Sequence, residues 1–250
     1  MIQLIKKGIH MKLNSFPKFL SAIVTILSLT TFFISCDTTQ NTNGNFSLSF
    51  GSTNSLLKTT SDSLQLTEVK ILLKDVKLEQ ESADKVTGGD HHGEGDEVVV
   101  RVGPFVVQLN LTGLTTDFIT SEIPAGMYDE IRFKIHKLEG SEIPPDPEFI
   151  DSQDTTKRYS VIVKGNYNGT PFVYRSSKSA HQKLRLDEPL VVEENTSTNL
   201  TITVDPYTWF YEHGTLLDPT DANNMDEIDH NISASFRNAF RDNNHDCNGD

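Results

Sequence analysis

The chain has 250 residues, of which 22 are Lys or Arg and 35 are Asp or Glu, giving a formal net charge of −13 at pH 7. A polypeptide this acidic repels phosphate backbones, so we expect no nucleic-acid partner. It contains only two cysteines, which excludes a disulfide framework and leaves packing of a core as the expected source of stability.

The N-terminal segment has the layout of a bacterial lipoprotein signal peptide. A short basic stretch with Lys12 and Lys18 precedes an uncharged apolar run over residues 19–34, and Ser35 comes directly before Cys36. We expect cleavage after residue 35 and attachment of lipid, such as palmitate, to the sulfur of Cys36. A transmembrane anchor and a plain secretion signal are the alternatives, but the apolar run is shorter than the roughly 20 residues of a spanning helix.

This interpretation places the protein in the bacterial cell envelope, anchored by lipid to a membrane, with the outer membrane favoured over the inner. The segment 36–45 is polar after its cysteine and predicts a flexible tether. We expect a β-sandwich domain over residues 46–211, followed by a C-terminal helix and acidic tail over residues 212–250. Removing residues 1–35 takes away four lysines and no acid, so the remainder is more acidic still.

The dominant hydrophobic period of the domain is two. Alternation of this kind places one set of side chains in a core and the other in water, as in antiparallel strands covered on one face. The sequence therefore predicts an all-β fold, an antiparallel β-sandwich of transthyretin-like or immunoglobulin-like type, with a C-terminal α-helix. The segments with the clearest alternation are 46–50, 105–111, 131–135 and 200–204.

Two turns are predicted from their residues. Asn168-Gly169 separates apolar alternation over residues 159–163 from Phe172 and Tyr174, and Asn-Gly suits the positive φ angles of a two-residue hairpin. The segment 123–126, Ile-Pro-Ala-Gly, predicts a turn that opens the next strand.

The segment 66–79 fits two patterns. Its apolar residues fit one face of a helix, or a strand whose inward phase slips at Lys74-Asp75. A β-bulge explains such a slip, because one extra residue resets which side chains face the core. We favour the strand.

The C-terminal segment changes to a helical period. Apolar residues recur at spacings of three and four, and residues 218–221 supply a turn and a capping residue. Asp226 and Glu227 fall in the expected first turn, where the helix dipole favours acids. We expect a helix that packs on a sheet or covers an edge strand, with this stripe: Met225, Ile228, Ile232, Phe236, Ala239 and Phe240.

Four segments together resemble a widespread family of bacterial lipoproteins that carry a β-sandwich domain of unknown function. They are the strand 69–78, the segments 103–111 and 123–131, and Leu217-Asp218-Pro219-Thr220. The resemblance covers about residues 46–205 and is strongest around Pro124-Ala125-Gly126. It implies a sandwich fold and an envelope location, and it supplies no activity and no site residues.

Two segments are candidate metal sites. In the tail, Asp242, Asn244 and Asp246 alternate as the oxygen ligands of calcium loops do, but the glycine and glutamate of a complete loop are missing. Calcium is thus the one candidate cofactor. The alternative is that the tail is a frayed acidic terminus without a metal. The segment 90–97 holds two histidines and four carboxylates among glycines, for which we favour a solvated loop over a metal site.

The aromatic cluster around Tyr207, Trp209 and Tyr211 is the candidate ligand surface, because exposed aromatic rings stack on sugars and anchor protein partners. The alternative, which we favour for most of the cluster, is core packing between the sandwich and the C-terminal helix.

The sequence contains no recognised catalytic motif. Carboxylates are plentiful, for example Glu193-Glu194 and residues 146–154, and their abundance is no evidence for an acid pair. We therefore expect a non-catalytic, membrane-anchored binding or structural module for a glycan or an envelope protein. An envelope hydrolase with an unrecognised carboxylate site is the alternative.

Overall fold

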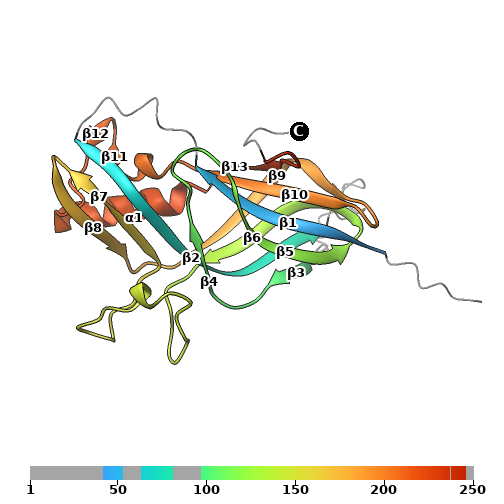
Figure 1. Cartoon of the computed structure of the whole chain (residues 1–250), viewed down its shortest axis with the longest axis horizontal. Helices are drawn as coiled ribbons and strands as arrows, with labels where there is room; N and C mark the ends of the chain where they lie inside the picture. Colours follow the sequence, from blue (N-terminus) through green and yellow to red (C-terminus); the bar gives the residue numbers. More distant parts are fainter. Residues whose placement is uncertain (1–41, 53–62, 81–96, 237, 246–250) are drawn as a thin grey trace, which may run out of the picture. The chain divides into compact units, whose positions relative to one another are not determined.

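The computed structural model describes residues 42–52, 63–80, 97–236 and 238–245, and these form a β-sandwich (Figure 1). The first sheet has four strands in the order β13-β10-β1-β5. Its strands are β1 (Asn43–Ser52), β5 (Thr116–Pro124), β10 (Ser197–Val204) and β13 (Asn238–Arg241).

The second sheet has seven strands, with the order β8-β7-β2-β6-β9 and with β3 and β4 also paired to β2. Its strands are β2 (Leu64–Gln80), β3 (Glu97–Arg101), β4 (Phe105–Gln108), β6 (Gly126–Ile135), β7 (Val161–Tyr167), β8 (Thr170–Ser176) and β9 (Ala180–Val192). A small ribbon joins β11 (Tyr211–Glu212) to β12 (Thr215–Leu216).

The helical elements are short. Among the described residues, three 3₁₀ helices, η3 (Pro147–Phe149), η4 (Pro206–Phe210) and η5 (Ala222–Asn224), accompany one α-helix, α1 (Met225–Ala234). In the described part of the chain, no helix is both long enough and apolar enough to cross a membrane.

The core lies between the two sheets and consists of the inward positions of the alternating strands. Phe46, Leu48 and Phe50 of β1 are fully buried, as are Leu200 and Ile202 of β10. Burying large apolar side chains of this kind stabilises each site by about 1.5–3 kcal/mol relative to exposure. The predicted all-β sandwich is therefore confirmed.

The pairing of β1 with β10 differs from the expected antiparallel pattern, because these two strands run parallel. Period-two alternation reports which face is buried and carries no information about strand direction. Parallel pairing is accompanied here by burial on both faces of β10, whose residues Thr198–Val204 are all buried.

The long strand β2 confirms the strand interpretation of the ambiguous segment, together with its bulge. Asp75 has a φ of 57°, and the pairing of β2 with β6 shifts register between Lys74 and Lys77. Val69, Ile71 and Leu73 face the core before the bulge, and Val76 and Leu78 face it afterwards. One extra residue restores the inward phase.

Both predicted turns are confirmed. β7 and β8 form a hairpin in which Asn168 and Gly169 have φ angles of 49° and 77°. Positive φ at both central positions is the geometry of a type I′ turn. Between β5 and β6, Ala125 forms the turn at the Pro-Ala-Gly segment, and its N–H donates to the carbonyl of Thr42.

The C-terminal helix is confirmed, but it ends earlier than expected. Ile228 and Ile232 of α1 are buried, and Phe236 packs in the core just beyond its end. The hydroxyl of Tyr174 in β8 donates to Oδ1 of Asp229 at 2.7 Å, which fixes α1 to that strand. Including Ala239 and Phe240 in the helical stripe was wrong, because both lie in strand β13, paired with β10.

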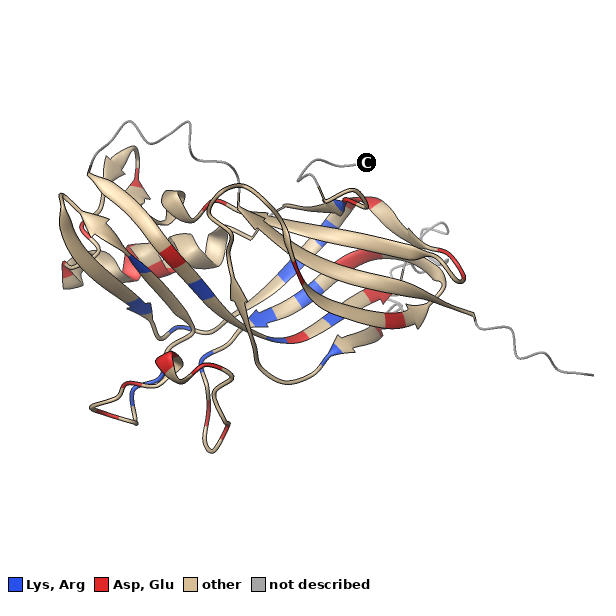
Figure 2. Ribbon diagram, in the orientation of Figure 1, with Lys and Arg blue, Asp and Glu red and all other residues tan. Residues whose placement is uncertain are grey.

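Residues of both charges lie along the strands of the seven-stranded sheet (Figure 2), and several of them form ion pairs between neighbouring strands. The buried carboxylate of Glu130 in β6 contacts Arg132 at 2.6 Å and Lys183 of β9 at 2.9 Å. Desolvation opposes ionisation of Glu130, but hydrogen bonds from these two cations hold its pKa below the ordinary value. The acids and bases of these ion pairs therefore largely neutralise one another.

Candidate functional site

Several predicted site residues lie outside the described residues. They include the proposed lipid-attachment residue Cys36, the histidines of the segment 90–97, and Asp246 of the candidate calcium loop. In the residues that the structure describes, no group of three or more His, Cys, Asp or Glu side chains could hold a metal ion.

The described part of the C-terminal tail is used for packing. Asp242 is fully buried, and its Oδ2 accepts a hydrogen bond from the hydroxyl of Thr201 at 3.0 Å. Its carbonyl accepts from Nδ2 of Asn199 at 2.8 Å, whereas Asn244 is exposed. Asp242 and Asn244 therefore face different surroundings, and the carboxylate of Asp242 stabilises the outer face of β10.

The aromatic cluster is mostly core. Trp209 and Phe210 of η4 are fully buried, while Tyr207 and Tyr211 are half-buried. The ring of Phe210 lies 5.8 Å from that of Phe172 in an edge-on arrangement. The favoured interpretation is confirmed for Trp209, which is not available as an exposed platform for sugar stacking.

The most distinctive surface feature is a long excursion between β6 and β7, residues 136–160, which we call the docked loop (Figure 1). It contains the short helix η3 and an isolated β-bridge between Ile150 and Arg158. Its length exceeds the roughly 12–15 residues beyond which such connections are uncommon and often functional. The N–H of His136 donates to the carbonyl of Leu72, and the N–H of Leu72 donates to the carbonyl of Ser160. Both ends of the loop therefore meet at one residue of β2.

An apolar plug holds the docked loop on the outer face of the sheet. Leu138 and Phe149 from the loop pack with Leu72 of β2 and Ile162 of β7, and all four are at most 1% exposed. This small core is separate from the main core between the sheets. The loop is thus held by side chains that have lost their contact with water.

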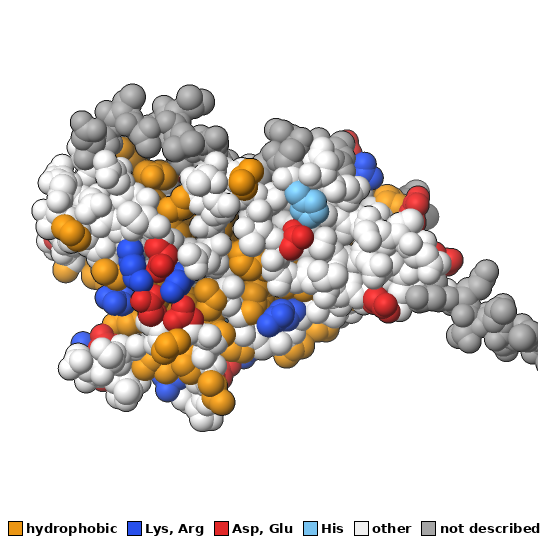
Figure 3. All heavy atoms as spheres, viewed as in Figure 1, with side chains coloured by type: hydrophobic (Ala, Val, Ile, Leu, Met, Phe, Trp, Pro, Cys, Tyr) orange, Lys and Arg blue, Asp and Glu red, His pale blue; other side chains and the backbone are white. Residues whose placement is uncertain are grey.

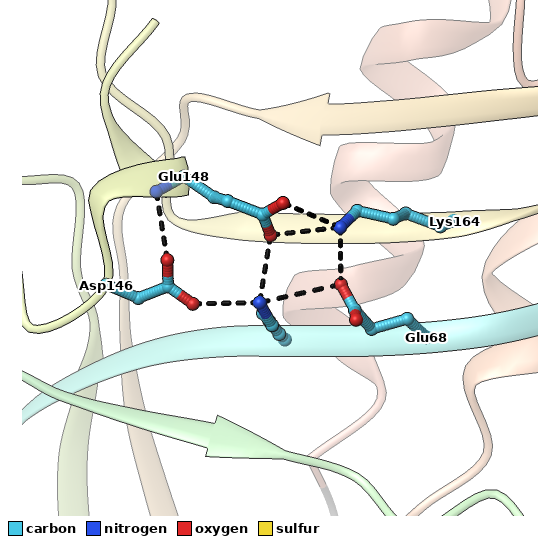
Figure 4. Close-up of polar contacts among 5 residues, drawn as sticks. Glu68, Asp146, Glu148 and Lys164 are labelled. Carbon is cyan, nitrogen blue, oxygen red and sulfur yellow. Dashed lines mark hydrogen bonds and ion pairs between the residues drawn. The ribbon is translucent and has the colours of Figure 1, made fainter. Parts of the chain in front are cut away.

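An ion-pair cluster closes one side of the plug and consists of Glu68, Lys70, Asp146, Glu148 and Lys164 (Figures 3 and 4). Lys70 of β2 lies 2.8 Å from the carboxylates of both Asp146 and Glu148. Lys164 of β7 lies 2.7 Å from Glu148 and 2.8 Å from Glu68. Figure 4 shows the two loop acids facing the two strand lysines, so the cluster ties the loop to both strands.

The electrostatics of the cluster shift the pKa values of Glu148, Lys70 and Lys164 toward the charged forms. Hydrogen bonds from Lys164 and Lys70 hold the pKa of Glu148 at about 2, against the opposing effect of burial. Burial lowers the pKa of Lys70, but the contacts with Asp146 and Glu148 outweigh it and the net shift is upward. The contact between Glu148 and the two lysines therefore favours the charged forms of all three side chains.

A second polar contact closes the other side of the plug. Oε1 of Glu142 lies 2.8 Å from Lys74 of β2, and Oε2 lies 2.7 Å from Nε2 of the buried His136. The N–H of Glu139 also donates to Oε2 of Glu142 at 2.8 Å. Burial opposes ionisation of Glu142, but the bonds from Lys74, Glu139 and His136 prevail and hold its pKa at about 2.

The apolar tip of the docked loop lies between these two contacts. Ile143 directly follows the fixed Glu142 and has 84% of its surface exposed. Pro145 and Pro147 are also exposed, on either side of the anchored Asp146. The tip therefore presents apolar side chains to solvent from a backbone that is held on both sides.

The chemistry of this site suits recognition better than acid–base catalysis. A general acid needs a carboxyl group whose pKa is raised toward neutrality. Glu142 and Glu148 are shifted in the opposite direction, and both are neutralised by lysines. The sequence shows the acids of residues 146–154, but it does not show that strand lysines neutralise those that face the sheet.

Comparison with known proteins gives little guidance. No protein-family model matches the chain. No curated protein matches its sequence. Among solved structures it is similar to MbnP from Methylosinus trichosporium, with a TM-score of 0.36 and 10% identity over 72% of this chain and 81% of that one. The function proposed below therefore rests on contacts within this chain.

Proposed function

We propose that this chain is a lipid-anchored, non-catalytic binding protein of the bacterial cell envelope, and that its docked loop recognises a protein partner. The observation that supports this most directly is the exposure of Ile143, at 84%, beside the tightly held Glu142. The resemblance of the sequence to envelope lipoproteins agrees with the location.

The docked loop is fixed on the sheet before it binds a partner, and this lowers the entropic cost of binding. A mobile loop loses conformational entropy when it binds, and this loss makes the free energy of binding less favourable. Here the plug around Phe149 and the ion pairs of Lys70 and Lys74 fix the backbone in advance. Proline at 145 and 147 restricts it further.

An apolar tip on an acidic protein favours a protein partner with an apolar concave surface. Exposed apolar side chains gain free energy when a complementary surface removes them from water. A glycan would be favoured by an exposed aromatic platform, and the only tryptophan of the chain, Trp209, is buried. The tip is therefore better matched to protein than to sugar.

The first strand begins near the end of β6 that lies opposite the docked loop. β1 begins at Asn43, so residues 37–42 would span at most roughly 20 Å from an acylated Cys36. Asn43 pairs with Pro124, beside the start of β6, whereas the docked loop leaves the far end of β6 at residue 136 (Figure 1). The ten residues of β6 cover roughly 33 Å. The start of β1 and the docked loop are therefore separated by about the length of β6.

The anchor is tested by mass spectrometry of the mature protein. We expect the mature chain to begin at Cys36 and its mass to include acyl chains. We also expect Cys36→Ser to leave the precursor unprocessed. An unmodified N-terminus on the mature chain would refute the lipid anchor.

Recognition is tested by a photo-crosslinking amino acid placed at Ile143 in cells that make the protein. The control position is Val191 of β9, which is 41% exposed and pairs with Met127 at the end of β6 opposite the docked loop. We expect one adduct from position 143 that position 191 does not give, and about tenfold weaker binding of that purified partner by Ile143→Ser but not by Val191→Ser. Equal adducts from both positions, or an unchanged affinity of Ile143→Ser, would exclude the tip.

A further inference from the structure

The solvent side of the docked loop carries a short proline-rich ridge. Exposed and half-buried positions alternate along residues 141–148, and the exposed positions are Ser141, Ile143, Pro145 and Pro147. The last three residues form what we call the proline ridge, and Ile143 is its most exposed member. Figure 3 shows hydrophobic side chains gathered on the docked loop beside the ion-pair cluster. The ridge is therefore an apolar edge of the loop that faces the solvent.

The proline ridge is uncharged although the chain is acidic. Acids occupy the alternate positions of the same segment and contact the strand lysines. Glu142 lies 2.8 Å from Lys74, and Asp146 lies 2.8 Å from Lys70. These ion pairs neutralise the acids of the segment and leave its apolar side chains on the solvent side. A partner that contacts the ridge thus gains free energy by removing apolar surface from water rather than by pairing charges.

The backbone of the ridge is extended, and its carbonyl groups are free to accept hydrogen bonds. Proline fixes φ near −65°, and a residue that precedes a proline is restricted to extended conformations. Asp146, which precedes Pro147, has a φ of −134° and a ψ of 124°. The carbonyls of residues 143–145 accept no hydrogen bond from any other described residue. A backbone set in advance, with its acceptors facing water, is typical of polyproline II segments.

These features select the groove of the partner. Grooves lined by aromatic side chains bind preformed proline-rich segments, because the rings pack against proline and the indole N–H or phenol O–H of Trp and Tyr can donate to free carbonyls. From Ile143 to Pro147 the ridge spans roughly 12 Å at about 3.1 Å per residue. We propose that the protein partner of the docked loop receives the proline ridge in such an aromatic groove. This inference rests on the proposed recognition by the docked loop.

A small aromatic probe tests the chemistry of the ridge without the partner. The full chain, with isotope-labelled proline, is titrated in the NMR spectrometer with N-acetyltryptophanamide and, separately, with N-acetylleucinamide. We expect saturable shifts at Pro145 and Pro147 with the tryptophan amide only. The control is Pro124, which is exposed at the other end of β6. Shifts at the ridge prolines no larger than at Pro124, or equally large with N-acetylleucinamide, would overturn the proposal.

The protein captured by crosslinking at position 143 provides the second test. We expect Pro145→Ala and Pro147→Ala each to weaken its binding about fivefold without lowering the melting temperature. Pro124→Ala is the matched control, because it keeps the carbonyl that accepts from Tyr128, and it should leave the affinity unchanged.

Salt separates an apolar groove from a charged one. Binding through the proline ridge should weaken less than about threefold between about 50 mM and 500 mM salt, because ionic strength screens contacts between exposed charges. A larger loss, or unchanged affinity of both ridge proline variants, would overturn the aromatic groove and leave recognition by the docked loop intact. The absence of any adduct from position 143 would refute both.

Discussion

Ile135 and Val161 lie on the same side of β2, opposite Leu73 and Ile71, although the whole docked loop separates them in the sequence. Strands β6 and β7 thus follow one another along β2, and the loop leaves and re-enters at the seam between them. Because its two ends are already adjacent, closing the loop costs little beyond its own ordering. The sandwich can therefore carry this long excursion without altering its core.

The plug is tested by Phe149→Ala. Phe149 is fully buried against Leu72 and Ile162, and truncation of a buried phenylalanine costs about 3–5 kcal/mol. We expect a loss of this size in the free energy of unfolding measured with urea. The control is Ile143→Ala at the exposed tip, which should change stability by less than about 0.5 kcal/mol. Equal effects of the two variants would mean that the loop is not docked.

The contact of Glu142 with Lys74 and His136 predicts a pH dependence. The pKa of Glu142 is about 2 in the folded protein and near 4.5 when it is unperturbed. A lowered pKa contributes stability that is present above pH 4.5 and is lost as the pH falls toward 2. Unfolding measured between pH 2 and 6 should show this loss, and Glu142→Gln should make it smaller while leaving the part that Glu148 contributes. The exposed Glu139→Gln is the control and should leave the profile unchanged.

Trp209 is the only tryptophan and is fully buried, so it reports on the junction of η4 and α1. We expect a blue-shifted emission maximum and weak quenching by iodide in the native protein, both of which disappear in denaturant. Strong quenching by iodide under native conditions would contradict the packing of this ring.

The bulge in β2 predicts opposite effects of two substitutions at one position. Asp75 has a φ of 57°, a conformation that glycine adopts freely and β-branched residues avoid. Asp75→Gly should therefore be nearly neutral, whereas Asp75→Val should lower the free energy of unfolding by about 1–2 kcal/mol. Similar stability of the two variants, measured by urea unfolding, would argue against the positive φ.

Strands with strong alternation of apolar and polar residues can be predicted from the sequence. The sequence does not predict strands β9 and β13, and the reason differs between the two. The strands at residues 46–50 and 200–204 follow from their alternating, inward apolar positions. β9 was missed although Leu184 and Leu186 alternate with charged neighbours, because its inward set also includes the polar Gln182. In β13, Ala239 and Phe240 continue the spacing of α1 by coincidence, and pairing with β10 decides their structure.

The docked loop could not be predicted from local pattern. Leu138 and Phe149 are isolated apolar residues among charged residues and prolines, with no period that indicates burial. They are buried only because Leu72 and Ile162 lie on the outward face of neighbouring strands. The lysines that pair with the loop acids are distant in the sequence, so the site depends on tertiary contacts that a local pattern does not contain.

Amide hydrogen exchange in the native protein tests most directly whether the docked loop is a fixed platform. The N–H of Tyr159 donates to the carbonyl of Phe149, and that of Ile150 donates to Pro147. We expect slow exchange at both amides at neutral pH, at rates comparable to those of the strand amides of β7, and fast exchange at both amides in Phe149→Ala. Exchange in the wild type as fast as in an unfolded peptide would contradict this expectation.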